Sequence, residues 1–290
     1  MAIKDLLNNS VVILNKPPKL SSHEVSVITK QILGVSKSGH AGTLDPQVSG
    51  VLIVALGRAT KLLQFITKAD KTYVCIIKFK NILAKTEILS LFEKFTGTIT
   101  QTPPKESAVR KVARKRHVFY IKFLEQSKEN PRLVLFETKV EAGTYIRTLC
   151  DDIGKICGGA RMEELRRVKS GSVGETKAIT LQQLKHIYQM YLQTQEDKQL
   201  LKVIKPPEFY IDFPKVMIKN SALKSISNGA QIMFPAIKDA QMGVKKNNLV
   251  YLCDEQSKFF GVGTSLFDYA ELPKKQGIKG LAVNLERVHI

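Results

Sequence analysis

The paired prolines of Lys205-Pro206-Pro207 constrain the fold most, because they divide the sequence into two differently patterned parts. Two successive prolines end a helix and stiffen a linker, since proline lacks the backbone N–H and restricts the residue before it. Before them, long strand and helix patterns are mixed; after them, short strand patterns crowd together. A chain of 290 residues can hold one large and one small domain. We therefore predict domains over residues 1–205 and 206–290.

Strand and helix patterns in the first part predict an α+β domain. Apolar runs or alternating apolar residues predict strands at 11–14, 51–56, 73–79, 118–124 and 133–140. Ser21 with Glu24, and Thr180 with Gln183, have the spacing of capping boxes that begin helices, and another helix is expected over 145–156 with Thr144 as its cap. Strict β-α-β alternation is missing, so the sheet should be mixed and largely antiparallel.

The second part predicts a small β-barrel. Its short strand patterns lie at 216–218, 249–253, 259–263 and 281–285, with one short helix at 221–226. Turn-forming residues separate the strands, as is typical of compact all-β domains.

An excess of positive charge indicates a nucleic-acid partner. The 45 Lys and Arg outnumber the 26 Asp and Glu, which gives a net charge of +19. A dense run lies between two predicted strands and should form an exposed loop that contacts RNA phosphates. Its cations are Lys105, Arg110, Lys111, Arg114, Lys115 and Arg116. The plain alternatives are a solvated face, or a protein embedded in a large RNA assembly.

Other function classes find little support. The four cysteines and five histidines show no zinc-ligand spacing, and no phosphate-binding glycine motif is present. We therefore expect no metal and no small-molecule cofactor. The N-terminus is too polar for a signal sequence and no apolar run is long enough for a membrane span, so a cytoplasmic protein is expected.

Asp45 is the candidate catalytic residue in the glycine-rich stretch 39–50, which is predicted to be a loop. Pro46 biases Asp45 toward extended backbone, which would hold one carboxylate at the rim of a sheet. Taken alone, the pattern is more typical of a simple turn. Tyr145 and Arg147 stand two residues apart and share no helical face unless Tyr145 still lies in the preceding turn.

The segment 39–46, Gly-His-Ala-Gly-Thr-Leu-Asp-Pro, resembles the TruB and dyskerin family of pseudouridine synthases. Further segments match in family order and make the resemblance specific. They lie at 14–18, 22–25, 49–52, 56–61, 71–73, 143–149 and 164–167. Segment 103–110 is similar to the archaeal and eukaryotic dyskerin-type branch, and 206–290 resembles the PUA domain that follows in that branch.

The resemblance implies a role for each matching residue. Asp45 would attack the uridine, after which the detached base rotates and rejoins through its carbon 5, and Arg147 would pair with this carboxylate. Tyr73 would stack on the target base and serve in proton transfer, and His40 would help displace that base. Tyr145 and Leu165 would line the pocket, and the run from Lys105 to Arg116 would clamp RNA.

Three functional hypotheses remain open on the sequence. One is a standalone enzyme for the T-loop uridine of tRNA. Another is an enzyme that modifies rRNA uridines selected by an H/ACA guide RNA, together with small archaeal H/ACA proteins. The third, a non-catalytic RNA-binding scaffold of such a ribonucleoprotein, is disfavoured because Asp45, Tyr73 and Arg147 are all present.

Overall fold

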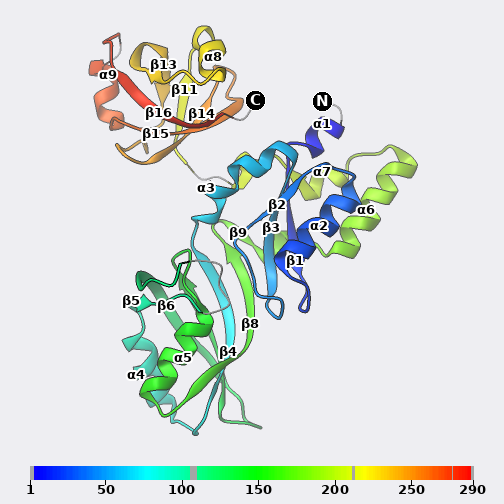
Figure 1. The fold of residues 1–290 in the computed structure, drawn as a ribbon, viewed down its shortest axis with the longest axis vertical. Coiled ribbons are helices and arrows are strands. Elements are labelled where there is room, and N and C mark those ends of the chain that lie inside the picture. The colour runs from blue at the N-terminus through cyan, green and yellow to red at the C-terminus, as the bar shows by residue number, and fades with distance from the viewer. Residues whose placement is uncertain (1–2, 105–109, 211–212, 276, 289–290) are drawn as a thin grey trace. The chain divides into compact units, whose positions relative to one another are not determined.

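The computed structural model describes residues 3–104, 110–210, 213–275 and 277–288. The chain forms two compact units, residues 1–205 and 206–290, each with its own core. The first is built around a mixed sheet with helices on its sides (Figure 1). This architecture confirms the predicted α+β class.

The first unit contains most of the regular structure. Its helices are α1 (Ile3–Leu7), α2 (Ser22–Leu33), α3 (Leu63–Thr67), α4 (Lys85–Lys94), α5 (Ile146–Ile156), α6 (Leu181–Thr194) and α7 (Leu200–Val203). Its strands are β1 (Val11–Lys16), β2 (Ser38–Ala41), β3 (Ser49–Leu56), β4 (Lys71–Phe79), β5 (Gly97–Gln101), β6 (Arg114–Gln126), β7 (Leu133–Val140), β8 (Ala160–Ser170), β9 (Val173–Gly174) and β10 (Ile204–Lys205).

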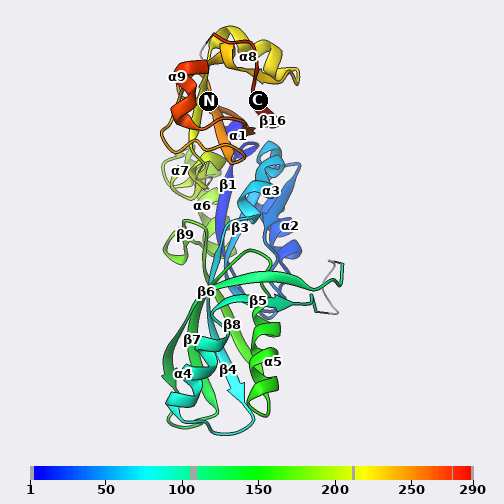
Figure 2. The same cartoon turned by 90° about the vertical axis from the view of Figure 1, so that its left-hand side faces the viewer.

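The sheet of the first unit consists of two halves joined at one place. Its strand order is β10-β1-β3-β8-β4-β7-β6-β5, with β2 added to β3 and β9 to β8. Strands β3 and β8 run parallel and pair only through Ser49 with Arg166 and Gly50 with Arg167. One hydrophobic core packs α2 and α6 against β1 and β3, whereas another packs α4 and α5 against β4 to β8 (Figure 2).

Local sequence signals are confirmed where they are self-contained. Ser21 is the N-cap of α2 and forms a capping box with Glu24, and Gly34 is the C-cap of this helix. Thr180 is the N-cap of α6 and forms a capping box with Gln183. The predicted cap at Thr144 is wrong: Tyr145 occupies the N-cap of α5.

Several strands of the first unit depart from the sequence-based expectation, which also lacks β5 and the short strands β9 and β10. Part of the loop predicted over 39–50 is strand β2, which pairs with β3. Strand β8 is absent from the prediction because charged residues on both of its faces obscure the alternation of apolar ones. Strand β6 begins at Arg114, so the last three cations of the basic run lie in a strand rather than in a loop.

The second unit curls a six-stranded sheet into a near-closed small barrel around its own core. Its strands are β11 (Lys215–Ile218), β12 (Ile232–Met233), β13 (Ile237–Ala240), β14 (Leu249–Cys253), β15 (Phe259–Ser265) and β16 (Leu281–Val288), and its helices are α8 (Asn220–Ser227) and α9 (Leu272–Lys275). The predicted barrel is confirmed.

Gly50 is required where the two halves of the first sheet meet. Its φ is +107°, and a Cβ atom there would lie 2.2 Å from the backbone oxygen of Arg167. We predict that Gly50→Ala lowers the free energy of unfolding by more than about 3 kcal/mol, since positive φ and a backbone clash act together. Urea denaturation monitored by circular dichroism measures the change.

Gly97→Ala is the matched control. Gly97 also has a positive φ, +98°, but an added Cβ would meet no atom within 4 Å. This variant should lose only about 1–2 kcal/mol, the cost of the left-handed backbone alone. Equal losses in the two variants would contradict the proposed clash at Gly50.

Candidate active site

Asp45 lies in a tight turn between β2 and β3. Its backbone C=O accepts the N–H of Val48 at 3.0 Å, which closes a four-residue turn with Pro46 in second place. Leu44 and Val48 on either side are 3% and 2% exposed, whereas the Asp45 side chain is 51% exposed. The turn therefore buries its apolar residues and presents one carboxylate at the surface.

Long-range hydrogen bonds hold the backbone on both sides of Asp45. The buried hydroxyl of Ser22, at the start of α2, accepts the Leu44 N–H at 2.8 Å and donates to the Leu44 C=O at 3.0 Å. Beyond Asp45, the Pro46 C=O accepts from Lys16 Nζ at 3.0 Å and from the Lys19 N–H at 2.8 Å. These contacts fix the position from which the carboxylate projects.

Lys16, at the end of β1, is fully buried in the wall beneath this turn. Its ammonium group also donates to the carbonyls of Pro17 and Leu20. Burial lowers the pKa of Lys16, while the nearby carboxylate of Asp45 acts in the opposite direction. The sequence interpretation did not single out Lys16 or Ser22; their place in the matching segments 14–18 and 22–25 was the only signal.

The Asp45 carboxylate forms an ion pair with the guanidinium of Arg147, which lies in the first turn of α5. Tyr145 has extended backbone at the N-cap, so it still lies in the turn, and this satisfies the condition under which Tyr145 and Arg147 can serve one site. Residues 102 positions apart in the sequence meet here.

Tyr73 and Leu165 lie on adjacent strands close to this turn. Tyr73 on β4 is 9% exposed and belongs to the same hydrophobic cluster as Leu44, and Leu165 on β8 packs against that cluster. Tyr73 stands opposite Arg167 in the β4–β8 pairing. The structure therefore gathers Asp45, Arg147, Tyr73 and Leu165 around one region of the first unit.

His40 lies on β2, opposite Val54 of β3. Burial lowers the pKa of its imidazole, and the positive charges of His23 and Arg167 add to the effect. Its Nδ1 atom is buried and has no hydrogen-bond partner among the residues that the structure describes. A neutral ring is therefore favoured at this position.

Arg167 is the main residue that the sequence interpretation misplaced. Its charge groups it with Arg161, Arg166 and Lys169 as a second basic cluster in the sequence, yet it is 1% exposed. Its Nε donates to the Val51 C=O at 2.8 Å and its guanidinium NH2 donates to the Gly42 C=O at 3.0 Å. Arg167 thus ties β8 to both ends of the segment that carries Asp45.

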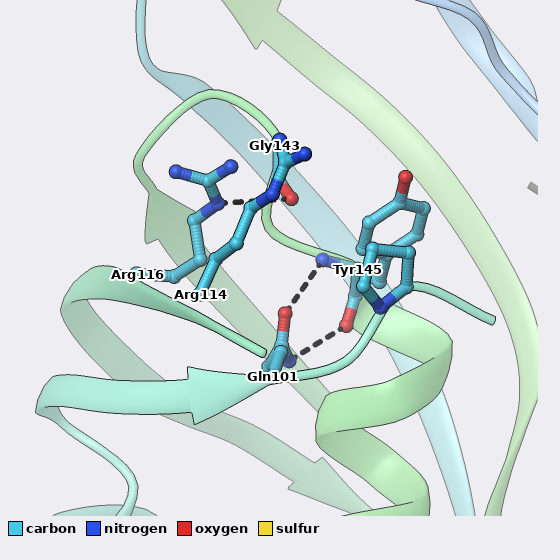
Figure 3. A pocket seen from close by; sticks show the side chains of 6 residues that line it. Gln101, Arg114, Arg116, Gly143 and Tyr145 are labelled. Atoms are coloured by element: carbon cyan, nitrogen blue, oxygen red, sulfur yellow. Dashed lines mark hydrogen bonds between the residues drawn. The ribbon is translucent and has the colours of Figure 1, made fainter. Parts of the chain in front are cut away.

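Tyr145 lines a separate small pocket with a cationic rim (Figure 3). The other lining residues include Gln101 of β5, Arg114 and Arg116 of β6, and Gly143. Lys115 lies on β6 between the two arginines, and Arg110 and Lys111 are exposed just before the strand. Lys105 falls outside the described residues.

The described residues contain neither a metal-binding cluster nor a membrane-spanning helix. No group of three or more His, Cys, Asp or Glu side chains is arranged to bind a metal within residues 3–104, 110–210, 213–275 and 277–288. Across the same ranges, no helix is long and apolar enough to cross a membrane.

Comparisons with known proteins show the family of the chain. Residues 30–84 match the model of the TruB family pseudouridylate synthase N-terminal domain, residues 147–211 match the tRNA pseudouridylate synthase B C-terminal domain, and residues 214–289 match the PUA domain. A probable tRNA pseudouridine synthase B of Archaeoglobus fulgidus is 38% identical over 99% of this chain and 87% of its own length. The chain belongs to the TruB family of pseudouridylate synthases.

Solved structures place the chain in the archaeal branch of the family. The crystal structure of a Cbf5–Nop10–Gar1 complex contains a chain that matches with a TM-score of 0.91 and 38% identity, covering 100% of this chain and 88% of that one. A structure of an H/ACA ribonucleoprotein bound to a substrate RNA contains another, with a TM-score of 0.89, 36% identity and coverage of 100% and 88%. The chain is thus a pseudouridine synthase, an isomerase, and the non-catalytic scaffold is not favoured.

Lys71 is a buried lysine whose surroundings destabilise its charged form. It is 5% exposed, and its ammonium group donates to the Thr67 C=O at 2.6 Å and to the Ala69 C=O. Burial, followed by the charge of Arg167, lowers the pKa of Lys71 to about 8 from 10.5.

The lowered pKa of Lys71 predicts a rise in stability with pH. Between the folded and unfolded pKa values the unfolded chain binds more protons, so the free energy of unfolding should increase by roughly 2 kcal/mol from about pH 8 to about pH 10 on this account. Urea denaturation of the wild type and of Lys71→Met at several pH values isolates this contribution. The control is Lys78→Met, because Lys78 lies on the same strand but is only half-buried; this variant should keep the rise in stability with pH. If stability still rises with pH in Lys71→Met, the rise does not come from Lys71.

Proposed function

We propose that Asp45 is the nucleophile of this pseudouridine synthase and that Arg147 holds its carboxylate in place. The observation that carries the proposal is the Asp45–Arg147 ion pair on a turn fixed from both sides. A preorganised nucleophile lowers the barrier because its orientation is set before the substrate arrives.

The reaction conserves all atoms and electrons. The Asp45 carboxylate bonds to the ribose as the bond between the ribose and the base nitrogen breaks. The base rotates while it remains in the pocket, and its carbon 5 then bonds to the ribose as the bond to Asp45 breaks. The proton lost from carbon 5 is replaced by one on the released nitrogen. We assign Tyr73 to stacking on the base and to this proton transfer, because it belongs to the same hydrophobic cluster as Leu44, the residue before Asp45.

The target uridine must leave its stack, which costs a few kcal/mol. We assign His40 to displacing the base, and Tyr145 and Leu165 to lining the space that receives it. Phosphate contacts offset the cost of extrusion, and we assign these contacts to the basic run. That run comprises Lys105, Arg110, Lys111, Arg114, Lys115 and Arg116.

The substrate is proposed to be the T-loop uridine of tRNA, together with rRNA uridines selected by an H/ACA guide RNA. Relatives named probable tRNA pseudouridine synthase B support the first, and the matching chains of H/ACA complexes support the second. Small proteins such as the Nop10 and Gar1 of those complexes are the proposed partners. We also propose a cytoplasmic location, where these RNAs are accessible.

Replacing Asp45 by Asn tests the nucleophile. Asp45→Asn keeps the size of the side chain but removes its charge, so pseudouridine formation should fall by more than about a thousandfold. The dissociation constant for RNA should stay within about twofold, because phosphate contacts dominate affinity. Tritium release from carbon-5-labelled tRNA, with and without guide RNA and partner proteins, measures the product.

The control for this experiment is Asp70→Asn. Asp70 is also a partly exposed aspartate in an ion pair, with Lys139 at 3.4 Å, but it lies outside the candidate site. It should retain turnover within about twofold of the wild type, as is usual for surface pairs. Full turnover by Asp45→Asn would refute the assignment.

The basic run predicts a salt-dependent affinity for RNA. Changing Lys111, Arg114 and Lys115 together to Ala should make the slope of log affinity against log salt shallower by roughly 2 units. Lys185, Lys198 and Lys202 are exposed lysines in the 181–203 region, and their triple Ala variant preserves the change in net charge as a control. Filter binding over a range of salt concentrations gives the slope for each triple variant. Equal slopes in the two variants would show that the basic run does not contact RNA.

A further inference from the structure

The side chain of Gln101 forms two hydrogen bonds with the backbone of Tyr145 (Figure 3). Its Oε1 accepts the Tyr145 N–H at 3.0 Å, and its Nε2 donates to the Tyr145 C=O at 3.1 Å. Gln101 is the last residue of β5, 3% exposed and 44 positions away in the sequence. One buried carboxamide thus satisfies both backbone groups of a single residue.

This contact supplies what the start of α5 lacks locally. The N-cap residue Tyr145 makes no side-chain capping bond, and the buried hydroxyl of Thr144 has no hydrogen-bond partner in the described part of the chain. Unpaired backbone groups at a helix start are usually satisfied by a side chain one to three residues away. Here Gln101 of a distant strand satisfies the N–H of the N-cap residue itself, two positions before Arg147.

The segment before Tyr145 is held by the neighbouring strand. On β6, the N–H of His117 donates to the Glu141 carboxylate at 3.0 Å, and Arg116 Nε donates to the Gly143 C=O at 3.3 Å. The Glu141 N–H donates in return to the His117 C=O at 2.8 Å. Strands β5 and β6, which lie on either side of the basic run, therefore hold residues 141–145, the stretch before Arg147, by hydrogen bonds.

We propose that Gln101 is a positioning residue for pseudouridine formation, acting through Tyr145 and Arg147 to hold the guanidinium against Asp45. The proposal rests on the function assigned above. Two directed hydrogen bonds define both the place and the orientation of the N-cap residue of the helix. Because a misplacement of about 1 Å at a reacting group can cost on the order of a hundredfold in rate, the contact should control turnover more than RNA binding.

The test compares Gln101→Leu with Gln126→Leu. Leucine keeps most of the volume and removes both hydrogen bonds. Gln126, at the far end of β6, is the matched control because its Nε2 also makes two side-chain-to-backbone bonds, to the carbonyls of Leu83 and Pro131 at 3.1 and 2.7 Å. Both variants should lose comparable stability, about 1–3 kcal/mol.

Single-turnover kinetics at saturating enzyme separate positioning from folding. The rate constant of Gln101→Leu should fall about tenfold, while its RNA dissociation constant and that of the control stay within about twofold of the wild type. A merely structural role would lower the amplitude of product formation and leave the rate constant unchanged. An unchanged rate constant in Gln101→Leu, or an equal fall in Gln126→Leu, would overturn the proposal.

Hydrogen exchange of the free protein gives a readout that does not need turnover. The peptide containing Tyr145 and Arg147 should exchange at least about fivefold faster in Gln101→Leu than in the wild type, with no change in Gln126→Leu. Unaltered exchange would refute the positioning role whatever the activity. A wild-type chain that forms no pseudouridine with partners and guide RNA would instead refute the proposed function, and the exchange result would still decide the role of Gln101 at the helix.

Discussion

The buried guanidinium of Arg167 joins the two halves of the first unit. It projects from β8 at the single place where β8 meets β3, and it donates to carbonyls at both ends of the segment that carries Asp45. Gly50 leaves room for this approach, because any side chain there would strike the Arg167 backbone. The positive charge also reaches its neighbours: it contributes to the lowered pKa values of Lys71, His40 and Lys16. Arg147 pairs with Asp45 and Lys16 interacts with it electrostatically, and positive charge beside this aspartate suits a site that receives polyanionic RNA.

The position of Asp45 depends on elements from both halves of that unit. Ser22 and Lys16 hold the neighbouring backbone from the side of α2 and β1, whereas Arg147 approaches from α5. Gln101 fixes the start of α5 in turn. The half-exposed carboxylate pairs with the partly exposed Arg147, whereas Ser22, Lys16 and Gln101 are almost completely buried. This arrangement combines access for substrate with precise placement, since packed side chains and satisfied hydrogen bonds resist small displacements.

Sequence reasoning succeeded where the signal is local. Capping boxes marked the starts of α2 and α6, and uninterrupted alternation marked β7 with its observed bounds. It failed for β8, whose charged residues form strand pairs and ion pairs that no local pattern reveals, such as Arg166 with Glu175 at 2.8 Å. It also placed a cap at Thr144, because the true partner of that helix start lies 44 residues away.

The sequence by itself determined the family, the α+β class and the small barrel, because these follow from motif order, periodicity and residue type, and it singled out Asp45 as the candidate nucleophile. Only the tertiary structure decided that Arg167 is buried, and that Ser22, Lys16 and Gln101 support the site. These contacts join residues far apart in the chain. Their partners are backbone carbonyls and N–H groups, which every residue carries, so no residue type in the sequence identifies them.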